Sequence, residues 1–83
     1  MAQENKQTYF PKIVEVIAKQ LGKKPEQITR DQRVIEDLGA DSLDMIEMLM
    51  TLEENYGVVI PDDKAVTLKT VGHITDYLDT FSN

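Results

Sequence analysis

The chain has 83 residues, no cysteine and a net charge of −6. A domain of this size buries only about 60% of its unfolded surface, and without cysteine it has neither a disulfide nor a thiolate metal site to reinforce its core. We expect a single domain over residues 1–83, with a frayed polar segment at 1–7 and a compact part over 8–81.

The acidic residues are concentrated in one part of the sequence. Residues 1–35 hold seven Lys or Arg against four Asp or Glu, whereas nine acids and no base lie between Glu36 and Asp63. Such a surface attracts basic partners and repels a phosphate backbone, which argues against nucleic acid; a merely solubilising surface is the alternative. Because no signal peptide and no apolar run of membrane-spanning length is present, we expect a cytoplasmic protein without a membrane span.

The first predicted helix is an ordinary amphipathic one. Apolar residues between positions 10 and 21 recur at helical spacing, and Gly22 provides a stop signal. Residues 23–41 show no sustained periodicity, so we expect a long loop there with one short helical turn at 25–28. Four apolar side chains of this loop are expected to fold back over the core: Ile28, Val34, Ile35 and Leu38.

The second predicted helix follows a glycine turn at Gly39. Asp41 is a good N-cap residue, Asp44 stands at the capping-box position, and Gly57 fits the C-cap. Ser42 therefore falls in the first turn, where free backbone N–H groups and the positive end of the helix dipole suit a covalently attached phosphate.

This helix carries two separate apolar stripes at about 100° per residue. The inner stripe is expected to face the core and comprises Met45, Met48, Leu49, Leu52 and Tyr56. The outer stripe comprises Leu43, Ile46 and Met50, with Ser42 at one edge and Glu47 and Glu54 at the other. A core-facing helix needs only one apolar stripe, so the outer stripe indicates an interaction site. The alternative is that it packs under the loop or under the following segment.

The last third predicts an extended connector at 58–60, a short helix near 62–66 and a final helix capped by Thr70. The apolar stripe of the final helix comprises Val71, Ile74, Leu78 and Phe81. The predicted fold class is therefore all-α: a small helical bundle of three longer helices plus one short helix, with a long loop between the first two helices.

Enzymatic chemistry has little support in this sequence. Ser42 would need a nearby base to act as a nucleophile, and the only histidine, His73, is predicted to face solvent opposite much of the final helix's apolar stripe. The acids around Gly39 do not have the spacing of an EF-hand loop. We expect a carrier or binding module, with no catalytic residue and no specific metal site.

These residues resemble the bacterial type II acyl carrier proteins of fatty acid synthesis. The likeness is carried by the eight residues from Asp37 to Asp44, by the acids at 47 and 53–54, by Ile60-Pro61-Asp62 and by 76–78, and it extends from Phe10 to Leu78. The resemblance implies a four-helix-bundle phosphoprotein in which Ser42 is esterified with 4'-phosphopantetheine, transferred from coenzyme A by a phosphopantetheinyl transferase. The arm's thiol would carry the growing acyl chain as a thioester.

The resemblance also implies two further sets of site residues. Basic patches of the transferase, the fatty acid synthesis enzymes and acyltransferases would dock on a face, here called the docking face, made of Asp41, Leu43, Asp44, Ile46, Glu47, Met50 and Glu54. The acyl chain would lie in a cavity lined by Met45, Leu49, Leu52, Ile60, Ala65 and Leu78.

Two alternatives stay open at this point. One is a carrier for a specialised pathway, such as polyketide, lipid A or aminoacyl transfer, although Gly39-Ala40-Asp41 before the serine favours the fatty-acid type. The other is an acidic interaction module that is never modified. We expect a monomer in either case, because the outer stripe is narrow and bordered by acids.

Overall fold

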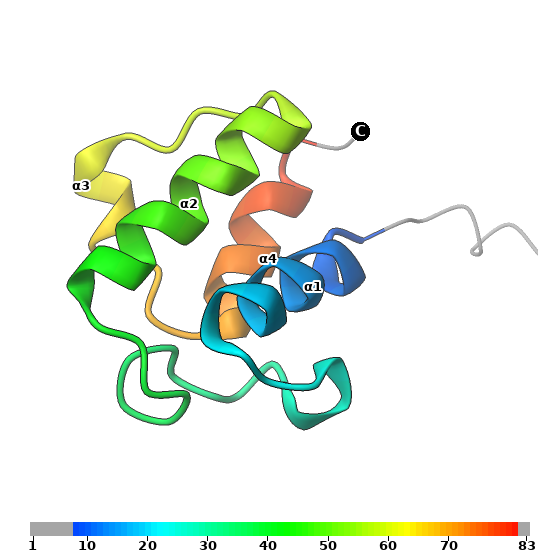
Figure 1. Cartoon of the computed structure of the whole chain (residues 1–83). Helices are drawn as coiled ribbons and strands as arrows, with labels where there is room; N and C mark the ends of the chain where they lie inside the picture. Colours follow the sequence, from blue (N-terminus) through cyan, green and yellow to red (C-terminus); the bar gives the residue numbers. More distant parts are fainter. Residues whose placement is uncertain (1–7, 82–83) are drawn as a thin grey trace, which may run out of the picture.

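The computed structural model describes residues 8–81 and shows a helical bundle (Figure 1). Its elements in chain order are α1 (Phe10–Leu21), η2 (Pro25–Gln27), α2 (Ser42–Tyr56), α3 (Asp62–Ala65) and α4 (Val71–Asp79). Within residues 8–81 there is no strand, only an isolated antiparallel bridge between Arg33 and Thr70. The predicted fold class is confirmed, including the long loop between the first two long helices. The expected fraying of residues 1–7 lies outside the described residues.

The helix ends follow local capping chemistry. α2 begins with a capping box, in which the Asp44 N–H donates to Asp41 Oδ1 (2.8 Å) and the Asp41 N–H donates to Asp44 Oδ2 (3.2 Å). α2 ends at Gly57, whose φ of 67° is the left-handed conformation that glycine adopts at low cost. Thr70 caps α4 by accepting a hydrogen bond from the His73 N–H (3.0 Å).

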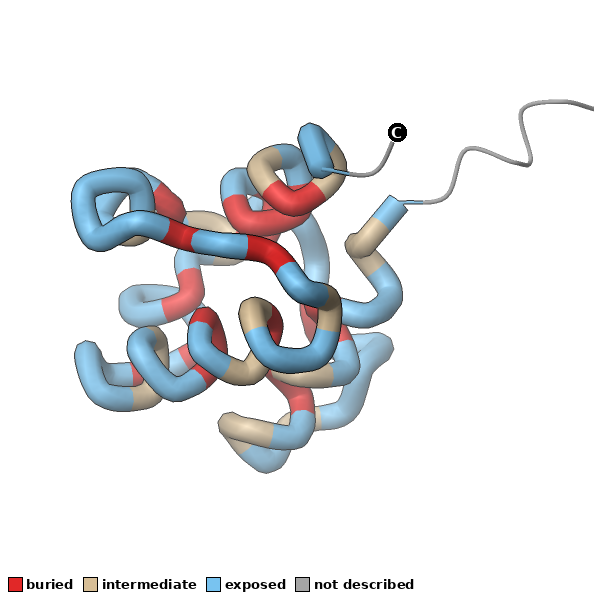
Figure 2. The backbone as a smooth tube through the Cα atoms, turned by 90° about the horizontal axis from the view of Figure 1, so that it is seen from above, coloured by how far each residue is buried: buried red, intermediate tan, exposed pale blue. Residues whose placement is uncertain are grey.

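The core lies where α1 packs against α2 and α4. Figure 2 shows the buried residues (red) gathered on the inward sides of the chain. The predicted inner stripe of α2 is buried at Met48, Leu49 and Leu52 and half-buried at Met45 and Tyr56. The largest fully buried side chains on the other two long helices are Ile13, Ile17, Ile74 and Leu78.

One prediction for the last helix was wrong. Phe81 was expected in the core, but 46% of its surface is exposed. α4 ends at Asp79, so the helical spacing that would have carried Phe81 inward stops two residues before it. Its ring packs edge-to-face on Tyr77 instead, with 5.2 Å between the ring centroids.

The long loop is attached to the start of α4 by backbone hydrogen bonds. Val34 N–H donates to the Lys69 carbonyl (2.9 Å), and the N–H groups of Val71 and Gly72 donate back to loop carbonyls. Three of the four expected core contacts of the loop, Ile28, Val34 and Leu38, are buried. Ile35 is 44% exposed, because in the turn over residues 34–38 its neighbour Val34 takes the inward position.

Gly72 has a steric role in this attachment. A Cβ at position 72 would lie 3.1 Å from the Arg30 carbonyl oxygen, the same oxygen that accepts the Gly72 N–H at 2.9 Å. From sequence, Gly72 appears only as a residue that lowers helix propensity. In the structure it allows the loop backbone to approach α4 closely.

Candidate functional site

Ser42 is the first residue of α2 and stands directly after the sharp turn at Gly39 (φ 83°) and the N-cap residue Asp41. Its side chain is exposed, and within residues 8–81 the structure gives its hydroxyl no hydrogen-bond partner. A free hydroxyl at this position is available to a reactant from outside the protein. The arrangement agrees with the predicted position of Ser42 in the first helical turn.

The N-terminus of α2 leaves two backbone donors beside this hydroxyl. The capping box occupies the N–H groups of Asp41 and Asp44. The N–H groups of Ser42 and Leu43 have no partner in the described part of the chain. Such groups, together with the helix dipole, favour an anionic oxygen near them.

The outer stripe of α2 faces solvent. Leu43 is 61% exposed, Ile46 55% and Met50 51%. The alternative in which these side chains pack beneath the loop is therefore ruled out. Of the acids assigned to the docking face, Asp41, Glu47 and Glu54 are exposed, and Asp44 is half-buried.

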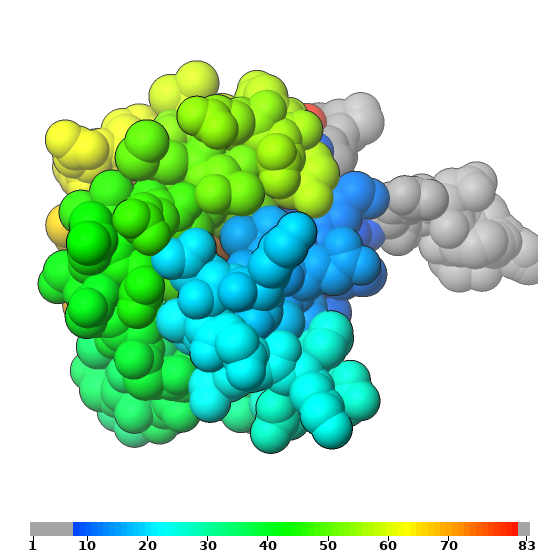
Figure 3. Space-filling model, in the orientation of Figure 1, coloured from blue at the N-terminus to red at the C-terminus, as the bar shows by residue number. Residues whose placement is uncertain are grey.

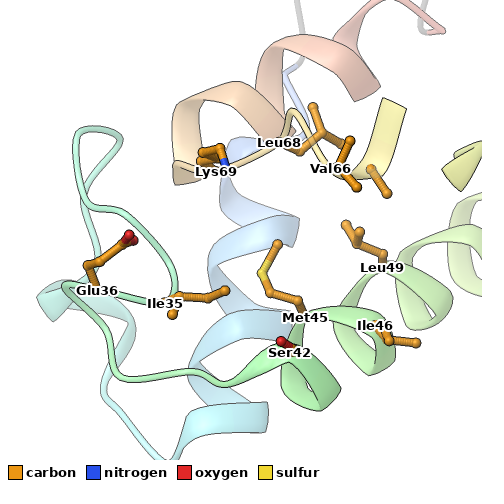
Figure 4. Close-up of a pocket in the computed structure, with 10 residues that line it drawn as sticks. Ile35, Glu36, Ser42, Met45, Ile46, Leu49, Val66, Leu68 and Lys69 are labelled. Carbon is orange, nitrogen blue, oxygen red and sulfur yellow. The ribbon is translucent and has the colours of Figure 1, made fainter. Parts of the chain in front are cut away.

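A pocket of about 310 Å³ opens beside Ser42, between the first half of α2 and the segment from α3 to the start of α4 (Figure 4). Its lining is mainly apolar and comprises Ile35, Glu36, Ser42, Met45, Ile46, Leu49, Ala65, Val66, Leu68 and Lys69. In Figure 4 the Met45 side chain points across the opening toward Val66 and Leu68. The pocket therefore offers an apolar space next to a free hydroxyl.

The structure divides the predicted cavity residues into two groups. Met45, Leu49 and Ala65 line this pocket, whereas Leu52, Ile60 and Leu78 are buried in the core and do not line it. The far wall and the rim of the pocket were not predicted from the sequence, and Ile46 was predicted only for the docking face. The unpredicted lining residues are Ile35, Glu36, Val66, Leu68 and Lys69. The positions of Ile35 and Val66 in the sequence do not follow a helical or strand repeat, so their exposure beside α2 could not be predicted.

Arg33 and Asp37 form a bidentate ion pair in the turn before Ser42. The Arg33 guanidinium donates to both Asp37 carboxylate oxygens (3.1 and 3.0 Å), and the Arg33 N–H donates to Oδ2 (2.8 Å). These side-chain and backbone hydrogen bonds lower the pKa of Asp37, and the same pair raises the pKa of Arg33. The pair closes the turn that leads to Gly39 and Ser42.

A pH dependence follows from this pair. Because the pKa of Asp37 is lowered in the folded state, its contribution to stability is present above the ordinary aspartate pKa of about 3.9 and is lost as the pH falls below that value. We expect the free energy of unfolding of the parent to fall more than that of Asp37→Asn between about pH 6 and about pH 3. Urea unfolding at both pH values measures this difference; equal losses in the two proteins would contradict it.

The described residues do not form a catalytic constellation around Ser42. His73 is exposed, as predicted, and its Nδ1 accepts the backbone N–H groups of Lys69 and Thr70 (3.3 Å each) at the start of α4. No group of three or more His, Asp or Glu residues in the described range is placed to hold a metal ion. No helix of residues 8–81 has the length and apolar character needed to cross a bilayer.

A small helical bundle that presents a free serine hydroxyl at a helix N-terminus, beside an apolar pocket, has the features expected of a carrier domain. The family described as "phosphopantetheine attachment site" matches residues 11–78. The chain is 44% identical over 71 residues to the acyl carrier protein of Wolinella succinogenes, covering 86% of this chain and 93% of the relative. It is 54% identical over 67 residues to that of Syntrophobacter fumaroxidans, covering 81% and 83%.

The solved acyl carrier protein from Enterococcus faecalis has the same fold, with a TM-score of 0.76 and 29% identity over 99% of this chain and 100% of that chain. The chain belongs to the acyl carrier protein family. Members of this family are carriers and not enzymes, and their domain bears a covalent 4'-phosphopantetheine group derived from coenzyme A. The resemblance stated from the sequence is thereby confirmed.

Proposed function

We propose that Ser42 is the residue that bears the 4'-phosphopantetheine arm. The observation that carries this proposal is the unpartnered hydroxyl of Ser42 at the exposed first turn of α2, on the edge of an apolar pocket. The free N–H groups of Ser42 and Leu43 support an anionic phosphodiester there. Asp41 and Asp44 oppose that negative charge electrostatically, so a partner that brings positive charge would be needed during attachment.

The attachment step is a phosphoryl transfer. The Ser42 oxygen forms a new bond to the phosphorus that carries the pantetheine arm, and the phosphoanhydride bond of coenzyme A breaks. Adenosine 3',5'-bisphosphate leaves with the bonding electrons, and a base of the transferase takes the serine proton. Magnesium supplied with coenzyme A would neutralise part of the developing phosphate charge. Once attached, the arm supplies a thiol that holds an acyl chain as a thioester.

The docking face is proposed to receive basic patches of partner enzymes. Three of its side chains, Leu43, Ile46 and Met50, give exposed apolar area next to the acids Glu47 and Glu54. Apolar contact surrounded by charge of one sign is suited to brief encounters with several partners, because the charges increase the association rate. The transferase, fatty acid synthesis enzymes and acyltransferases are the partners that we propose for this face.

Charge reversal on this face is expected to weaken docking. Glu47→Lys should lower the kcat/KM of a phosphopantetheinyl transferase for this protein by about tenfold, mainly through KM and more strongly at low salt. Glu26→Lys, at an exposed residue of η2, makes the same charge change away from the docking face. Equal effects of the two variants on steady-state loading kinetics would show that only net charge matters and that the face is not specific.

The apolar pocket is proposed to shelter part of the acyl chain. Its mouth adjoins Ser42, and Met45, Leu49 and Ala65 form part of its wall. Flexible methionine side chains adapt readily to a guest of variable shape. Burying several methylene groups, at about 0.8 kcal/mol each, would raise the melting temperature of the octanoyl form above that of the thiol form. Identical melting temperatures and unchanged amide shifts at these three residues would show that the acyl chain lies outside the pocket.

We infer further that this carrier works in fatty acid biosynthesis, as a cytoplasmic monomer. The Gly-Ala-Asp sequence before Ser42 and the likeness to acyl carrier proteins across at least 81% of the chain support this role. The test is a reconstituted fatty acid synthesis system supplied with acetyl- and malonyl-coenzyme A, with the loaded protein as the sole carrier. Acyl chains recovered as thioesters on the protein would support the proposal. Loading without elongation would favour a specialised pathway, and absence of loading would favour an unmodified interaction module.

A further inference from the structure

One side chain from the last turn of α1, that of Gln20, donates hydrogen bonds to two carboxylates of the docking face on α2. The carboxamide nitrogen of Gln20 donates to Glu47 Oε1 (2.7 Å) and to Asp44 Oδ1 (3.2 Å). Gln20 is half-buried, and Figure 3 shows the end of α1 (cyan) lying beside α2 (green) on this surface. A neutral residue of a different helix thus joins two carboxylates of the docking face.

Asp44 and Glu47 are three residues apart on α2, so their side chains are neighbours and their like charges repel. A carboxamide NH2 group has two N–H donors and can serve two acceptors at once. Because it carries no net charge, it holds both carboxylates together without cancelling the charge that a basic partner would meet. A lysine at position 20 would also bridge them but would neutralise part of the face.

The same hydrogen-bond chain continues to the residue before Ser42. Asp44 gives one carboxylate oxygen to Gln20 and the other to the Asp41 N–H, while Asp41 Oδ1 accepts the Asp44 N–H. Both oxygens of Asp44 are therefore held, and Glu47 is held at one oxygen. Side chains fixed in this way lose less conformational entropy when a partner binds them.

We propose that Gln20 is a positioning residue: it holds Asp44 and Glu47 in the arrangement that basic partner enzymes recognise. The proposal rests on the proposed docking function of this face and adds to it a residue outside α2. Gln20 acts through the two carboxylates, so its removal matters only while they are present. This dependence distinguishes a positioning role from direct contact with a partner and from a role in folding alone.

The first arm of the test compares Gln20→Leu with Asn55→Leu. Asn55 is an exposed amide in the same groove between α1 and α2, and its side chain makes no hydrogen bond within residues 8–81. With a phosphopantetheinyl transferase and coenzyme A, Gln20→Leu should raise KM by about three- to tenfold, with kcat unchanged. Asn55→Leu should leave both constants at the parent values. An unchanged KM in Gln20→Leu would overturn the proposal.

The second arm is a double-mutant cycle in the Asp44→Asn, Glu47→Gln background. In this background Gln20→Leu should have no further effect on KM, because the groups that it positions are gone. If the effects are additive, Gln20 acts independently of the carboxylates and the proposal is wrong. Melting curves of each variant show whether any loss reflects unfolding.

The third arm does not depend on covalent loading. The side-chain NH2 signals of Gln20 in a ¹⁵N-labelled protein should shift in Glu47→Gln, while those of Asn55 stay in place. Signals of Gln20 that do not move would show that the bridge is absent in solution. If the parent protein is never loaded, the proposed carrier function fails, and this arm still decides whether the bridge exists.

Discussion

Ser42→Ala is expected to lose all covalent loading while it keeps the fold of the parent. The side chain is exposed and its hydroxyl has no partner within residues 8–81, so its removal should change the free energy of unfolding by less than about 0.5 kcal/mol. The loss of function is nevertheless expected to be complete, because no other atom at the start of α2 can accept the phosphoryl group in the same place. Fluorescent coenzyme A and a phosphopantetheinyl transferase provide the measurement, with thermal melts run in parallel.

Thr51→Ala is the matched control for this change. Thr51 also lies on α2, but its hydroxyl donates to the Glu47 carbonyl (2.9 Å) and stands in the groove that faces α1. This variant should be loaded like the parent. Labelling that persists in Ser42→Ala and disappears in Thr51→Ala would show that the arm is attached to Thr51, which would contradict the proposed role of Ser42.

Leu78→Ala is expected to cause the largest loss of stability. Leu78 is fully buried on α4, in the core shared with α1 and α2. Truncating such a side chain leaves a cavity and costs about 3 kcal/mol, a large part of the ~5–15 kcal/mol that stabilises an ordinary domain. Denaturant unfolding should show a lower midpoint with a similar slope.

Leu43→Ala makes the same substitution on the exposed outer stripe of α2. It should cost less than about 0.5 kcal/mol and should affect only the interaction with partner enzymes. Comparing Leu78→Ala with Leu43→Ala also distinguishes a role in the core from a role in binding, which the sequence alone could not distinguish. Leu78 was predicted to line the acyl cavity, whereas the structure places it in the core, so we expect the destabilisation to dominate.

Local signals in the sequence were sufficient for the helices. The capping residues of α2, Asp41 and Gly57, each interact with groups at most four positions away, and they placed Ser42 correctly. The separation of inner and outer stripes needs only the helical repeat, and the exposure of Leu43, Ile46 and Met50 agrees with it. Information of this kind is present in any short window of the chain.

Features that depend on distant segments were not predictable in this way. Whether Val34 or Ile35 enters the core is decided by the hydrogen bond of Val34 to the Lys69 carbonyl, which joins segments far apart in the sequence. The close approach of Arg30 to Gly72 depends on the same attachment of the loop to α4. The pocket likewise needs residues 65–69 opposite α2, and the Gln20 bridge needs α1 beside α2.

Tryptic mapping of the loaded protein shows whether Ser42 bears the phosphopantetheine arm. Cleavage after Arg33 and Lys64 gives a peptide over residues 34–64 in which Ser42 is the only serine, since the other serine of the chain is Ser82. We expect a mass gain of one phosphopantetheine on this peptide, localised by fragmentation to Ser42. A gain localised to Thr51, Tyr56 or another peptide, or no gain after incubation with coenzyme A, Mg²⁺ and active transferase, would contradict it.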